Sequence, residues 1–448
     1  MATATIPTRR GRPLLGNIPD MRRDRLGFLL DLSRSGGDIC AFRIASRTIY
    51  LVSSPELAQT VLVDEAASFE KTERMRANLG MLLGNGLLTA LNEPHRRQRR
   101  LVAPAFQHRR IGAYAGVMAD YAERTQAEWR DGQALDAARE MMRLTLWVVG
   151  KTLFDADVRG EAGELGAALS TALRFANDRF TSVFAPPLSW PTPGNRRARQ
   201  ALDRLDATVY RMIRDRRASG EDKGDLLSML LQAQDEDDGS FMNDRQVRDE
   251  AMTLFLAGHE TTANALAWSW YLLAQHPAAY ARMRGEAREA LGRRAPALAD
   301  LERLPYTLRV LKEAMRLYPP APVISRQAAR PIDLGGHRLP EGALVLISPY
   351  TMHRRPDLFP DPNRFDPDRW TPERERELPR HAYMPFGGGP RICIGNHFAL
   401  MEGQIILAAL ARRVRFELVP GQRVEPEAVI TLRPKDGIRM TVRRDPQD

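Results

Sequence analysis

The chain of 448 residues has few cysteines and no long apolar run. Its two cysteines, Cys40 and Cys393, lie far apart in the sequence. That spacing argues against a disulfide framework and fits a reducing compartment. The first eleven residues are polar, with no apolar core of a signal peptide, and no later run reaches the roughly 18 apolar residues of a membrane span. We therefore expect a soluble, cytoplasmic protein without a membrane anchor.

Lysine, linkers and repeats are also scarce. Only five lysines occur among 66 basic residues, so arginine carries most of the formal charge of +10. Such a bias can reflect genomic base composition, and no basic–aromatic interleaving accompanies it, so we do not expect nucleic-acid binding. No Gly/Ser linker, low-complexity tract or internal repeat divides the chain. The length allows two or three domains, but nothing in the sequence supports a division.

The hydrophobic pattern indicates a mainly α protein with a small β part near each end. Residues 40–52 alternate like a hairpin, and residues 243–275 have the pattern of a long helix. Residues 69–91 look irregular and apolar, which suits the wall of a pocket. Near the C-terminus we expect three strands in one small sheet, at residues 415–419, 430–432 and 438–442.

The most informative stretch is Phe-Gly-Gly-Gly-Pro-Arg-Ile-Cys-Ile-Gly at residues 386–395. It places Cys393 in a glycine-rich turn just before a helical pattern. Backbone N–H groups and a helix N-terminus both stabilise a thiolate. A buried structural cysteine is the alternative for an arbitrary thiol, but these surroundings favour a functional one.

Two further patterns concern buried charge and a disturbed helix. His95 and Arg99 are four residues apart in a very basic helical segment, so they share a face and could reach one buried anion. The expected long helix carries Ala-Gly-His-Glu-Thr-Thr at residues 257–262. Glycine and threonine are unfavourable there, and a threonine hydroxyl can compete for the carbonyl four residues earlier.

Four landmarks occur in a fixed order along the chain. They are residues 257–262, the pair Glu313/Arg316, the run Pro-Asn-Arg-Phe at residues 362–365, and residues 386–395. Together they resemble the cytochrome P-450 family of haem-thiolate monooxygenases, and the last contains the family signature F-x-x-G-x-R-x-C-x-G in full. The resemblance covers essentially the whole chain. It implies a mainly α fold with small β-sheets, a triangular helical prism enclosing haem, as one catalytic domain over residues 1–448.

The resemblance assigns residues to a haem b (iron protoporphyrin IX). Cys393 resembles the axial ligand of the iron, and a thiolate ligand favours O–O cleavage. Phe386 resembles the residue that packs beside the sulfur, and Gly387, Gly389 and Gly395 resemble positions where backbone approaches the porphyrin. Basic residues resemble partners of the buried propionates, which need counter-charge: Arg391, Arg99, Arg326 and His95.

The resemblance also implies proton delivery and a structural triad. Glu260 and Thr261 match the acid–alcohol pair that supplies protons for O2 activation. Gly258 would leave room for O2, and His259 is interpreted as incidental. Glu313, Arg316 and Arg364 resemble a Glu-Arg-Arg triad that holds the cysteine loop. The residue before its last arginine is often acidic, but here it is Asn363.

The family's substrate regions fall on apolar residues of this chain, so the substrate is expected to be a fatty acid, terpenoid, steroid or polyketide-like molecule. The expected pocket residues are Met81, Leu82, Phe180, Leu254, Ala257, Val323, Ile324 and Thr431. Arg74 or Arg76 could anchor a carboxylate, although a solvated arginine is the simpler interpretation.

Electrons must come from another protein, because the chain has no flavin, iron–sulfur or dinucleotide motif. An acidic ferredoxin or flavodoxin, with a reductase that uses NAD(P)H, would suit a basic surface. That surface would include Arg96, Arg97, Arg100, Arg109, Arg110, Lys312, Arg412 and Arg413. We expect a monomer.

Three functions stay open from the sequence. The first is an O2-dependent monooxygenase that hydroxylates or epoxidises its substrate, and the presence of Glu260 and Thr261 favours it. The second is a peroxide-dependent or rearranging haem-thiolate enzyme. The third is a haem sensor or carrier without turnover.

Overall fold

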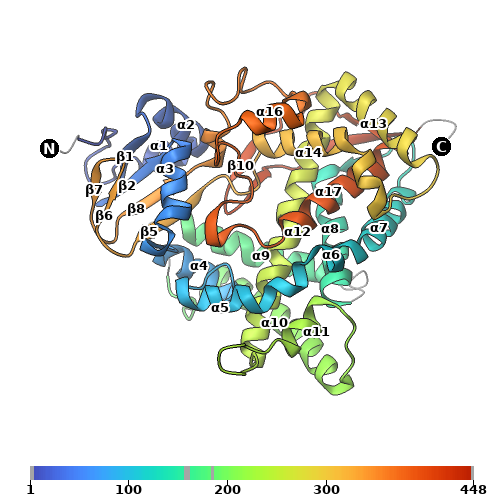
Figure 1. Cartoon of the computed structure of the whole chain (residues 1–448), viewed down its shortest axis with the longest axis horizontal. Helices are drawn as coiled ribbons and strands as arrows, with labels where there is room; N and C mark the ends of the chain where they lie inside the picture. The colour runs from blue at the N-terminus through green and yellow to red at the C-terminus, as the bar shows by residue number, and fades with distance from the viewer. Residues whose placement is uncertain (1–4, 156–161, 183–185, 445–448) are drawn as a thin grey trace. The chain divides into compact units, whose positions relative to one another are not determined.

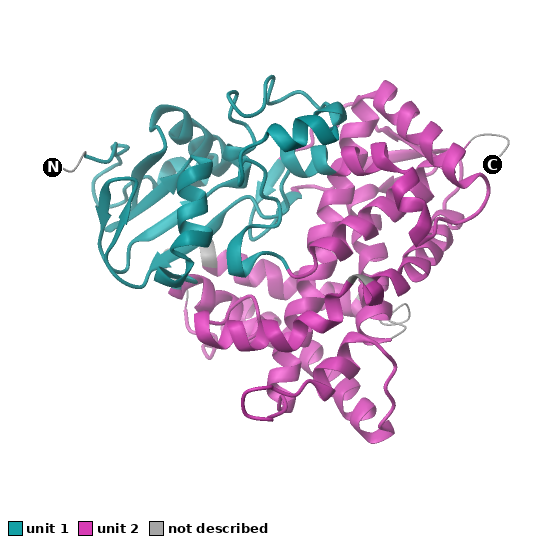
Figure 2. Cartoon of the chain, in the orientation of Figure 1, with its two compact units in different colours: residues 1–72, 312–393, 426–433 teal, residues 73–311, 394–425, 434–448 magenta. Residues whose placement is uncertain are grey.

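The computed structural model describes residues 5–155, 162–182 and 186–444, in which helices dominate and short strands lie near both ends of the chain (Figure 1). The chain forms two compact units, each built from segments that are distant in sequence (Figure 2). Unit 1 contains residues 1–72, 312–393 and 426–433, and unit 2 contains residues 73–311, 394–425 and 434–448. The prediction of a single catalytic domain stays a prediction.

Unit 1 is organised around a five-stranded sheet with the order β1-β2-β8-β5-β3, in which β2 and β8 are parallel. The hairpin predicted at residues 40–52 is its β1–β2 pair. Because side chains alternate along a strand, Leu51 belongs to the core cluster that contains Leu29, whereas Val52 belongs to the cluster that contains Leu62. Burial raises the pKa of the Cys40 thiol to about 12, as expected for an inert core residue. The strands are β1 (Ile39–Ile44), β2 (Arg47–Val52), β3 (Phe69–Glu70), β5 (Ile324–Ala328) and β8 (Leu344–Ile347).

Short helices and a hairpin complete unit 1. Ser54 begins α3, since its side chain accepts a hydrogen bond from the Leu57 N–H at 3.2 Å. Two elements, α14 (Pro305–Leu317) and β11 (Leu432–Pro434), run across a boundary between the units. The others are α1 (Ile18–Arg23), α2 (Arg25–Ser35), α3 (Pro55–Gln59), η1 (Thr60–Asp64), η2 (Ala66–Ser68), β6 (Ile332–Leu334), β7 (His337–Leu339), α15 (Pro349–Met352), η5 (Pro367–Trp370), α16 (Pro372–Glu377), η6 (Gly389–Arg391) and β10 (Pro426–Ala428).

Unit 2 is a helical body around α12 (Asp244–Gln275). The predicted long helix is confirmed, and Asn243 begins it by accepting the Gln246 N–H at 2.9 Å. Most of its length is buried, because α8, α10, α17 and α4 pack against it. The remaining helices are α4 (Glu73–Leu83), α5 (Asn92–Val102), η3 (Ala103–Phe106), α6 (His108–Ala113), α7 (Ala115–Ala127), α8 (Ala137–Phe154), α9 (Ala162–Thr181), α10 (Pro193–Ser219), α11 (Leu226–Gln232), α13 (Pro277–Leu291), η4 (Leu298–Arg303) and α17 (Asn396–Ala411).

Two sequence predictions are wrong in these regions. Residues 73–83, expected to be irregular, form α4, because Leu79, Leu82 and Leu83 lie on one helical face and are buried. The three C-terminal strands do not share one sheet. β12 (Arg439–Arg444) pairs with β9 (Val414–Leu418) and β4 (Ala134–Asp136), whereas β11 pairs with β10.

Within the described ranges, no helix combines the length and the apolar content that a membrane span requires.

Candidate functional site

The cysteine loop is a tight turn in unit 1. Gly387 and Gly389 have φ angles of +72° and +66°, a region that side chains disfavour. The Cys393 N–H donates to the Phe386 carbonyl at 2.9 Å and closes the loop. Cys393 itself is exposed, so its thiol is accessible to a ligand within this unit.

The glycines of this loop serve the protein as well as any cofactor. A Cβ at Gly389 would lie 1.7 Å from the carbonyl oxygen of Leu62, so this residue must be glycine for η6 to pack against η1. A Cβ at Gly387 would meet only Ile324 at 3.8 Å, and one at Gly395 only Phe106 at 3.6 Å. Gly389 therefore has a packing reason in unit 1, and its predicted approach to a porphyrin stays a prediction.

Three cations of unit 1 lie close enough to influence one another. The antiparallel pairing of β3 with β5 sets Glu70 opposite Gln327, which brings Lys71 to Arg326. Burial, together with the charges of Arg326 and Arg391, holds the pKa of Lys71 well below its usual range. Burial and Arg391 lower the pKa of Arg326 to about 10.

Arg391, which lies in the cysteine loop, also has a lowered pKa. Burial lowers its pKa to about 10, and the carboxylate of Glu70 opposes that shift. Like charges gathered in a buried place are unfavourable unless an anion joins them. The cluster Lys71–Arg326–Arg391 therefore fits a dianionic group such as the two propionates of a haem. Sequence reasoning named the two arginines and missed Lys71, whose signal was its place directly after a strand that pairs with the Arg326 strand.

His95 and Arg99 lie in unit 2, both on α5 and four residues apart as predicted. His95 is buried, with 4% of its surface exposed, and Arg99 is half-buried. Their shared helical face is therefore turned inward within this unit. Their role toward a cofactor stays a prediction.

The middle of α12 departs from the rest of that helix. Ala257 is exposed and Gly258 and Thr261 are half-buried, although residues on either side are buried. The Thr261 hydroxyl donates to the Ala257 carbonyl at 2.6 Å, so the threonine does compete for the carbonyl four residues earlier. This uncovered patch on a helix with long buried stretches suits a face that receives a flat apolar ligand.

Gly258 also has a packing reason. A Cβ there would lie 3.1 Å from Cγ2 of Val149 on α8, which is tighter than an ordinary contact. The glycine therefore permits close packing of α8 on α12, whereas its predicted service in leaving space for O2 stays a prediction. Glu260 is buried beside it, with 6% of its surface exposed.

Two more titratable groups surround this part of α12. Burial lowers the pKa of His259 to about 4, so the imidazole is neutral, and neither ring nitrogen has a hydrogen-bond partner among the described residues. On α17, burial raises the pKa of Glu402 well above its usual range, and the Thr262 hydroxyl opposes that shift. A neutral Glu402 next to Thr262 was not predicted, because nothing in its local sequence marks it.

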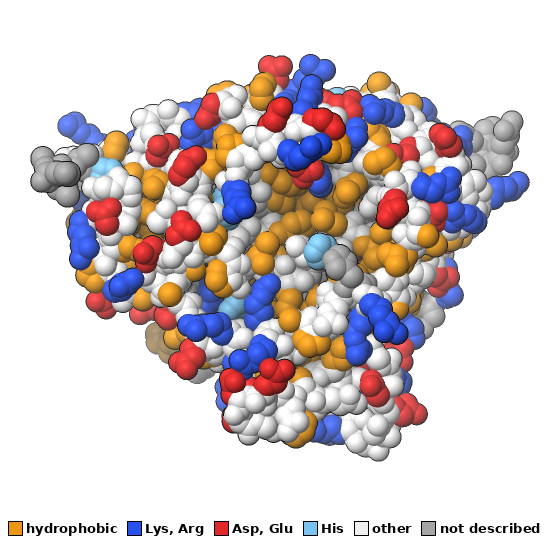
Figure 3. Space-filling view, viewed as in Figure 1, with side chains coloured by type: hydrophobic (Ala, Val, Ile, Leu, Met, Phe, Trp, Pro, Cys, Tyr) orange, Lys and Arg blue, Asp and Glu red, His pale blue; other side chains and the backbone are white. Residues whose placement is uncertain are grey.

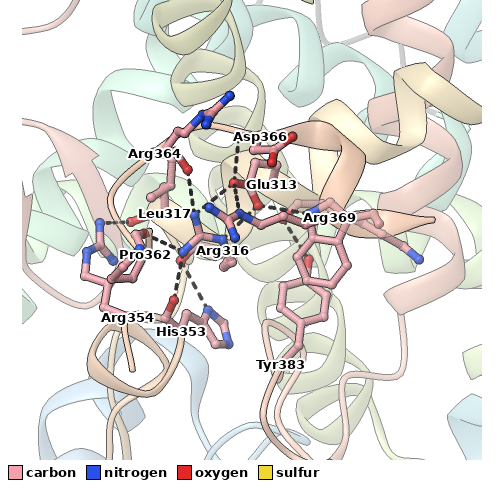
Figure 4. Close-up of polar contacts among 12 residues, drawn as sticks. Glu313, Arg316, Leu317, His353, Arg354, Pro362, Arg364, Asp366, Arg369 and Tyr383 are labelled. Carbon is pink, nitrogen blue, oxygen red and sulfur yellow. Dashed lines mark hydrogen bonds and ion pairs between the residues drawn. The ribbon is translucent and has the colours of Figure 1, made fainter. Parts of the chain in front are cut away.

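Unit 1 supports the cysteine loop through a buried ion pair (Figure 4). Arg316 and Glu313 pair through two hydrogen bonds of 2.8 Å each, and both side chains are fully buried. Arg316 also donates to the carbonyls of His353 at 2.8 Å and Pro362 at 2.7 Å. Glu313 accepts the Trp370 indole N–H at 3.0 Å. Buried charges of this kind are tolerated because every lone pair and proton has a partner.

The predicted third member of this triad is wrong. Arg364 offers only its backbone carbonyl to Arg316, at 3.1 Å, and its own side chain is exposed. The second guanidinium at Glu313 belongs to Arg369, whose Nε lies 3.3 Å from Oε1 (Figure 4). The sequence contains the pattern Pro-x-Arg-aromatic twice, at residues 362–365 and 367–370. The second copy has an acidic residue, Asp368, where the first has Asn363, so the missing acid was the signal of the wrong register.

His353 connects this ion pair to the cysteine loop. Its Nε2 accepts the Met384 N–H at 2.9 Å, and its Nδ1 lies 3.3 Å from the Arg316 carbonyl. Burial and the charge of Arg316 lower the pKa of His353 to about 3, so the ring stays neutral. Met384 in turn accepts the Gly387 N–H at 3.1 Å. Loss of the ion pair would therefore loosen the turn that presents Cys393.

The predicted substrate residues divide between the units. In unit 2, Leu82 and Leu254 are buried, while Met81 is half-buried and Ala257 exposed. In unit 1, Thr431 is buried and the half-buried Val323 and Ile324 pack on the two faces of the sheet. The side chain of Phe180 lies outside the described residues. Arg74 donates to the Ser182 carbonyl at 2.7 Å, so it holds α4 to the end of α9.

The predicted basic surface is smaller than expected. Arg97 and Arg100 bind Asp235, Arg412 is buried and paired with Glu123, and Lys312 pairs with Glu375 at 2.7 Å. The exposed arginines left on these segments are Arg96, Arg109 and Arg110. On the face drawn in Figure 3, basic and acidic side chains are interspersed.

Comparison with known proteins gives a consistent picture. The sequence model of one family, described as Cytochrome P-450, matches residues 6–441. The chain is 43% identical to cyclooctatin synthase of Streptomyces melanosporofaciens, over 94% of this chain and 92% of that protein. It is 39% identical to cyclooctat-9-en-7-ol 5-monooxygenase of the same species, over 91% and 89% of the two chains. It is 37% identical to pentalenene oxygenase of Streptomyces avermitilis, over 94% and 93%.

A solved structure agrees with the sequence comparisons. The crystal structure of the cytochrome P450DA heme domain superposes with a TM-score of 0.90 at 28% identity, covering 99% of this chain and 98% of that one. The predicted mainly α fold with small sheets is therefore confirmed.

Proposed function

The chain belongs to the cytochrome P-450 family and is a haem-thiolate monooxygenase of an apolar small molecule, and from this premise we propose that its substrate is a polycyclic terpenoid. The names of two similar proteins describe oxidation of cyclooctat-9-en-7-ol and of pentalenene, which are compounds of this class. The observation in this chain that carries the proposal is the apolar character of the predicted pocket residues, such as Leu82, Leu254 and Ala257. A rigid hydrocarbon gains its binding energy from such a surface.

We propose that the Cys393 thiolate would hold the iron of a haem b. When bound, the haem supplies the iron centre at which O2 is activated and one oxygen atom enters a C–H or C=C bond. The closed loop holds the Cys393 backbone at a fixed place, because Gly387 and Gly389 turn the chain and the Phe386 carbonyl accepts the Cys393 N–H. Phe386 would shield the sulfur from water.

Binding of the propionates would be shared among several cations. In unit 1 these are Lys71, Arg326 and Arg391, whose pKa values are lowered by burial, with neighbouring positive charge adding to the shift of Lys71 and Arg326. His95 and Arg99 of unit 2 are proposed for the same task. Each anion bound would relieve repulsion that the protein otherwise bears.

Glu260 and Thr261 are proposed to move protons toward the reacting oxygen. The Thr261 hydroxyl donates its proton to the Ala257 carbonyl, so its oxygen can accept a hydrogen bond from another donor. The carboxyl group of Glu260 lies next to it in sequence and is buried, which limits leakage to bulk solvent. The neutral His259 would not compete as a base, because burial lowers its pKa to about 4.

Electrons are proposed to come from NAD(P)H through an acidic ferredoxin or flavodoxin. Arg96, Arg109 and Arg110 remain exposed for that contact. A cytoplasmic monomer stays a prediction that rests on the cysteine content and on the family.

The ligand assignment is tested by Cys393→Ser. The reduced carbon monoxide complex of the wild type is expected to show the red-shifted Soret band of a thiolate ligand, and the variant is expected to lose it. A variant that keeps this band would overturn the assignment of Cys393.

The reaction class is tested by Thr261→Ala with a surrogate ferredoxin and its reductase. We expect NAD(P)H consumption to continue while product formation falls by about 10²-fold, since general acid catalysis contributes on this scale. Unchanged product formation would favour the peroxide-dependent alternative.

The substrate class is tested by titrating the low-spin to high-spin shift of the haem. Polycyclic terpene hydrocarbons and alcohols are expected to shift the spin state at lower concentrations than fatty acids or steroids of equal carbon number. Tighter binding of a fatty acid would refute the terpenoid proposal and leave the monooxygenase class intact.

A further inference from the structure

Segment 84–90 joins α4 to α5 and lies against α12 in unit 2. Its sequence is Gly-Asn-Gly-Leu-Leu-Thr-Ala, without a charged side chain. A loop with so little side-chain chemistry has to be held through its backbone. Thr89 ties the segment to itself, since its hydroxyl lies 2.8 Å from the Gly84 carbonyl.

Two consecutive acids of α12 bind the backbone of this segment. The Asn85 N–H donates to Oδ2 of Asp249 at 2.9 Å, and the Leu87 N–H donates to Oε2 of Glu250 at 3.0 Å. From α5, the Gln98 side chain donates to the Asn85 carbonyl at 2.6 Å. The loop is therefore fixed by α12 and α5 at Asn85 and by α12 at Leu87.

The segment also fits α12 too closely for side chains. Gly84 has a φ angle of +56°, and a Cβ there would lie 2.1 Å from the Asp249 carboxylate. A Cβ at Gly86 would lie 2.2 Å from the Thr253 hydroxyl. Because these two glycines have no side chain, the backbone of the segment comes close enough to α12 to bind the carboxyl groups of Asp249 and Glu250.

The two acids differ in counter-charge. Asp249 pairs with Arg248 at 2.9 Å, and Arg248 also binds Asp206 of α10. Glu250 has no such cation, and its Oε1 has no hydrogen-bond partner among the described residues. Burial raises the pKa of Glu250 to about 8, the Leu87 N–H opposes the shift, and the negative charge of Asp249 adds to it.

We propose that Asp249 and Glu250 are positioning residues of the monooxygenase, which hold segment 84–90 against α12 and thereby set the substrate wall that α4 contributes. This inference rests on the proposed function in one respect, the role of Met81 and Leu82 as substrate contacts. Glu250 acts as the protonated acid, so its carbonyl oxygen accepts from Leu87 without a buried charge. Ionisation favours opening of the segment, because the gain from hydrating the buried carboxylate outweighs its stronger hydrogen bond from the Leu87 N–H.

The charged groups around the clamp are few. Segment 84–90 carries none, and α5 reaches it through the uncharged Gln98. On α12 they are Asp249 and Arg248, and from α10 Asp206 acts through Arg248. Within the described part of the chain, Asp249 is the charge that shifts the pKa of Glu250.

The first experiment measures hydrogen exchange of the amides of Asn85 and Leu87 in the haem-loaded protein. Glu250→Ala is expected to raise the exchange rate of the Leu87 amide by about tenfold or more, since it loses its acceptor. Glu250→Gln keeps an acceptor oxygen and is expected to restore protection. Asp244→Asn, an exposed acid in the first turn of the same helix, is the matched control and is expected to change nothing. Unchanged protection of Leu87 in Glu250→Ala would overturn the proposal.

The second experiment separates positioning from general stability. Imidazole and 1-phenylimidazole both ligate haem iron, but only the second also fills the apolar space beside it. Glu250→Ala is expected to weaken 1-phenylimidazole by about tenfold and imidazole by less than about twofold. In the wild type, the ratio of the affinity for 1-phenylimidazole to that for imidazole is expected to fall above pH 8. In Glu250→Gln this ratio is expected to be independent of pH. Equal losses for both probes in Glu250→Ala would refute a role in the substrate wall.

The two experiments also distinguish failure of this inference from failure of the proposed function. Hydrogen exchange reports the clamp whether or not the substrate is a terpenoid, and the azoles need no knowledge of the substrate. If Glu250→Ala does not fold, Asp249→Asn and Glu250→Gln provide the same pair of readings. In that case, a pH-dependent azole preference that persists in Glu250→Gln would overturn the proposal.

Discussion

Two fully buried glutamates, one in each unit, hold a loop by its backbone in different ways. Glu313 accepts the Asp366 N–H at 2.9 Å and has two guanidinium groups, Arg316 and Arg369, beside it. Glu250 accepts the Leu87 N–H, and no cation among the described residues pairs with it. The comparison shows that the counter-charge decides the character of a buried anchor. A buried carboxylate beside a cation can stay ionised over a wide pH range. A buried carboxyl group without a cation is favoured only while it is protonated.

Glu313→Ala is expected to have the largest effect on stability. This change leaves Arg316 buried without its partner, and we expect a loss of about 3–5 kcal/mol of unfolding free energy. Urea denaturation followed by far-UV circular dichroism measures the loss. We also expect poor haem incorporation, read from the Soret absorbance per protein, because the path from Arg316 through His353 to Met384 is interrupted.

The parallel change, Glu250→Ala, is expected to cost less. It leaves one backbone N–H without an acceptor, which is worth about 1–3 kcal/mol. A larger loss for Glu250→Ala than for Glu313→Ala would contradict the role given to the counter-charge.

The two guanidinium groups near Glu313 also differ from the exposed Arg364. Arg369→Ala is expected to cost about 1–3 kcal/mol, because it removes a guanidinium from a buried carboxylate, whereas Arg364→Ala is expected to stay within about 0.5 kcal/mol, since its side chain is exposed. Both are measured by the shift in the urea midpoint. The reverse order would reinstate Arg364 as the member of the triad.

The remaining prediction concerns pH. The pKa of Glu250 rises from the ordinary 4.5 to about 8 in the folded state, so the folded protein keeps a proton that the unfolded chain has lost. Stability from this group is fully present below pH 4.5, falls as the pH rises, and is lost above pH 8. The slope is at most about 1.4 kcal/mol per pH unit. Denaturation at pH 5, 6.5 and 8 should show a flatter profile for Glu250→Gln, and identical slopes in both proteins would contradict the assignment.

Much of the fold and of the cysteine loop was predictable because the signals are local. The glycine turn before Cys393 and the capping Asn243 can be identified from adjacent residues. Lys71 and His353 could not be found this way, since each gains its role from a partner distant in sequence: Lys71 from Arg326, and His353 from Met384. Arginine was too common in this chain for a motif to identify the right one, as the exchange of Arg364 for Arg369 shows.

Surface charge was the least predictable property. Arg97 and Arg100 read as free cations in the sequence, yet both bind Asp235, which follows them by more than a hundred residues. Whether a basic residue is available depends on such distant acids, and these pairings follow from the tertiary fold.

The support of the cysteine loop has a consequence for the order in which the protein is made. Its members are the ion pair Glu313–Arg316, the joint at His353 and the backbone of Leu62 beneath Gly389. All of them precede Cys393 in the sequence, so they leave the ribosome before Cys393 does. The strands β1, β2, β3, β5 and β8 also precede it. The thiol can therefore emerge into a scaffold that is already present, whereas α12 of unit 2 must wait for α17.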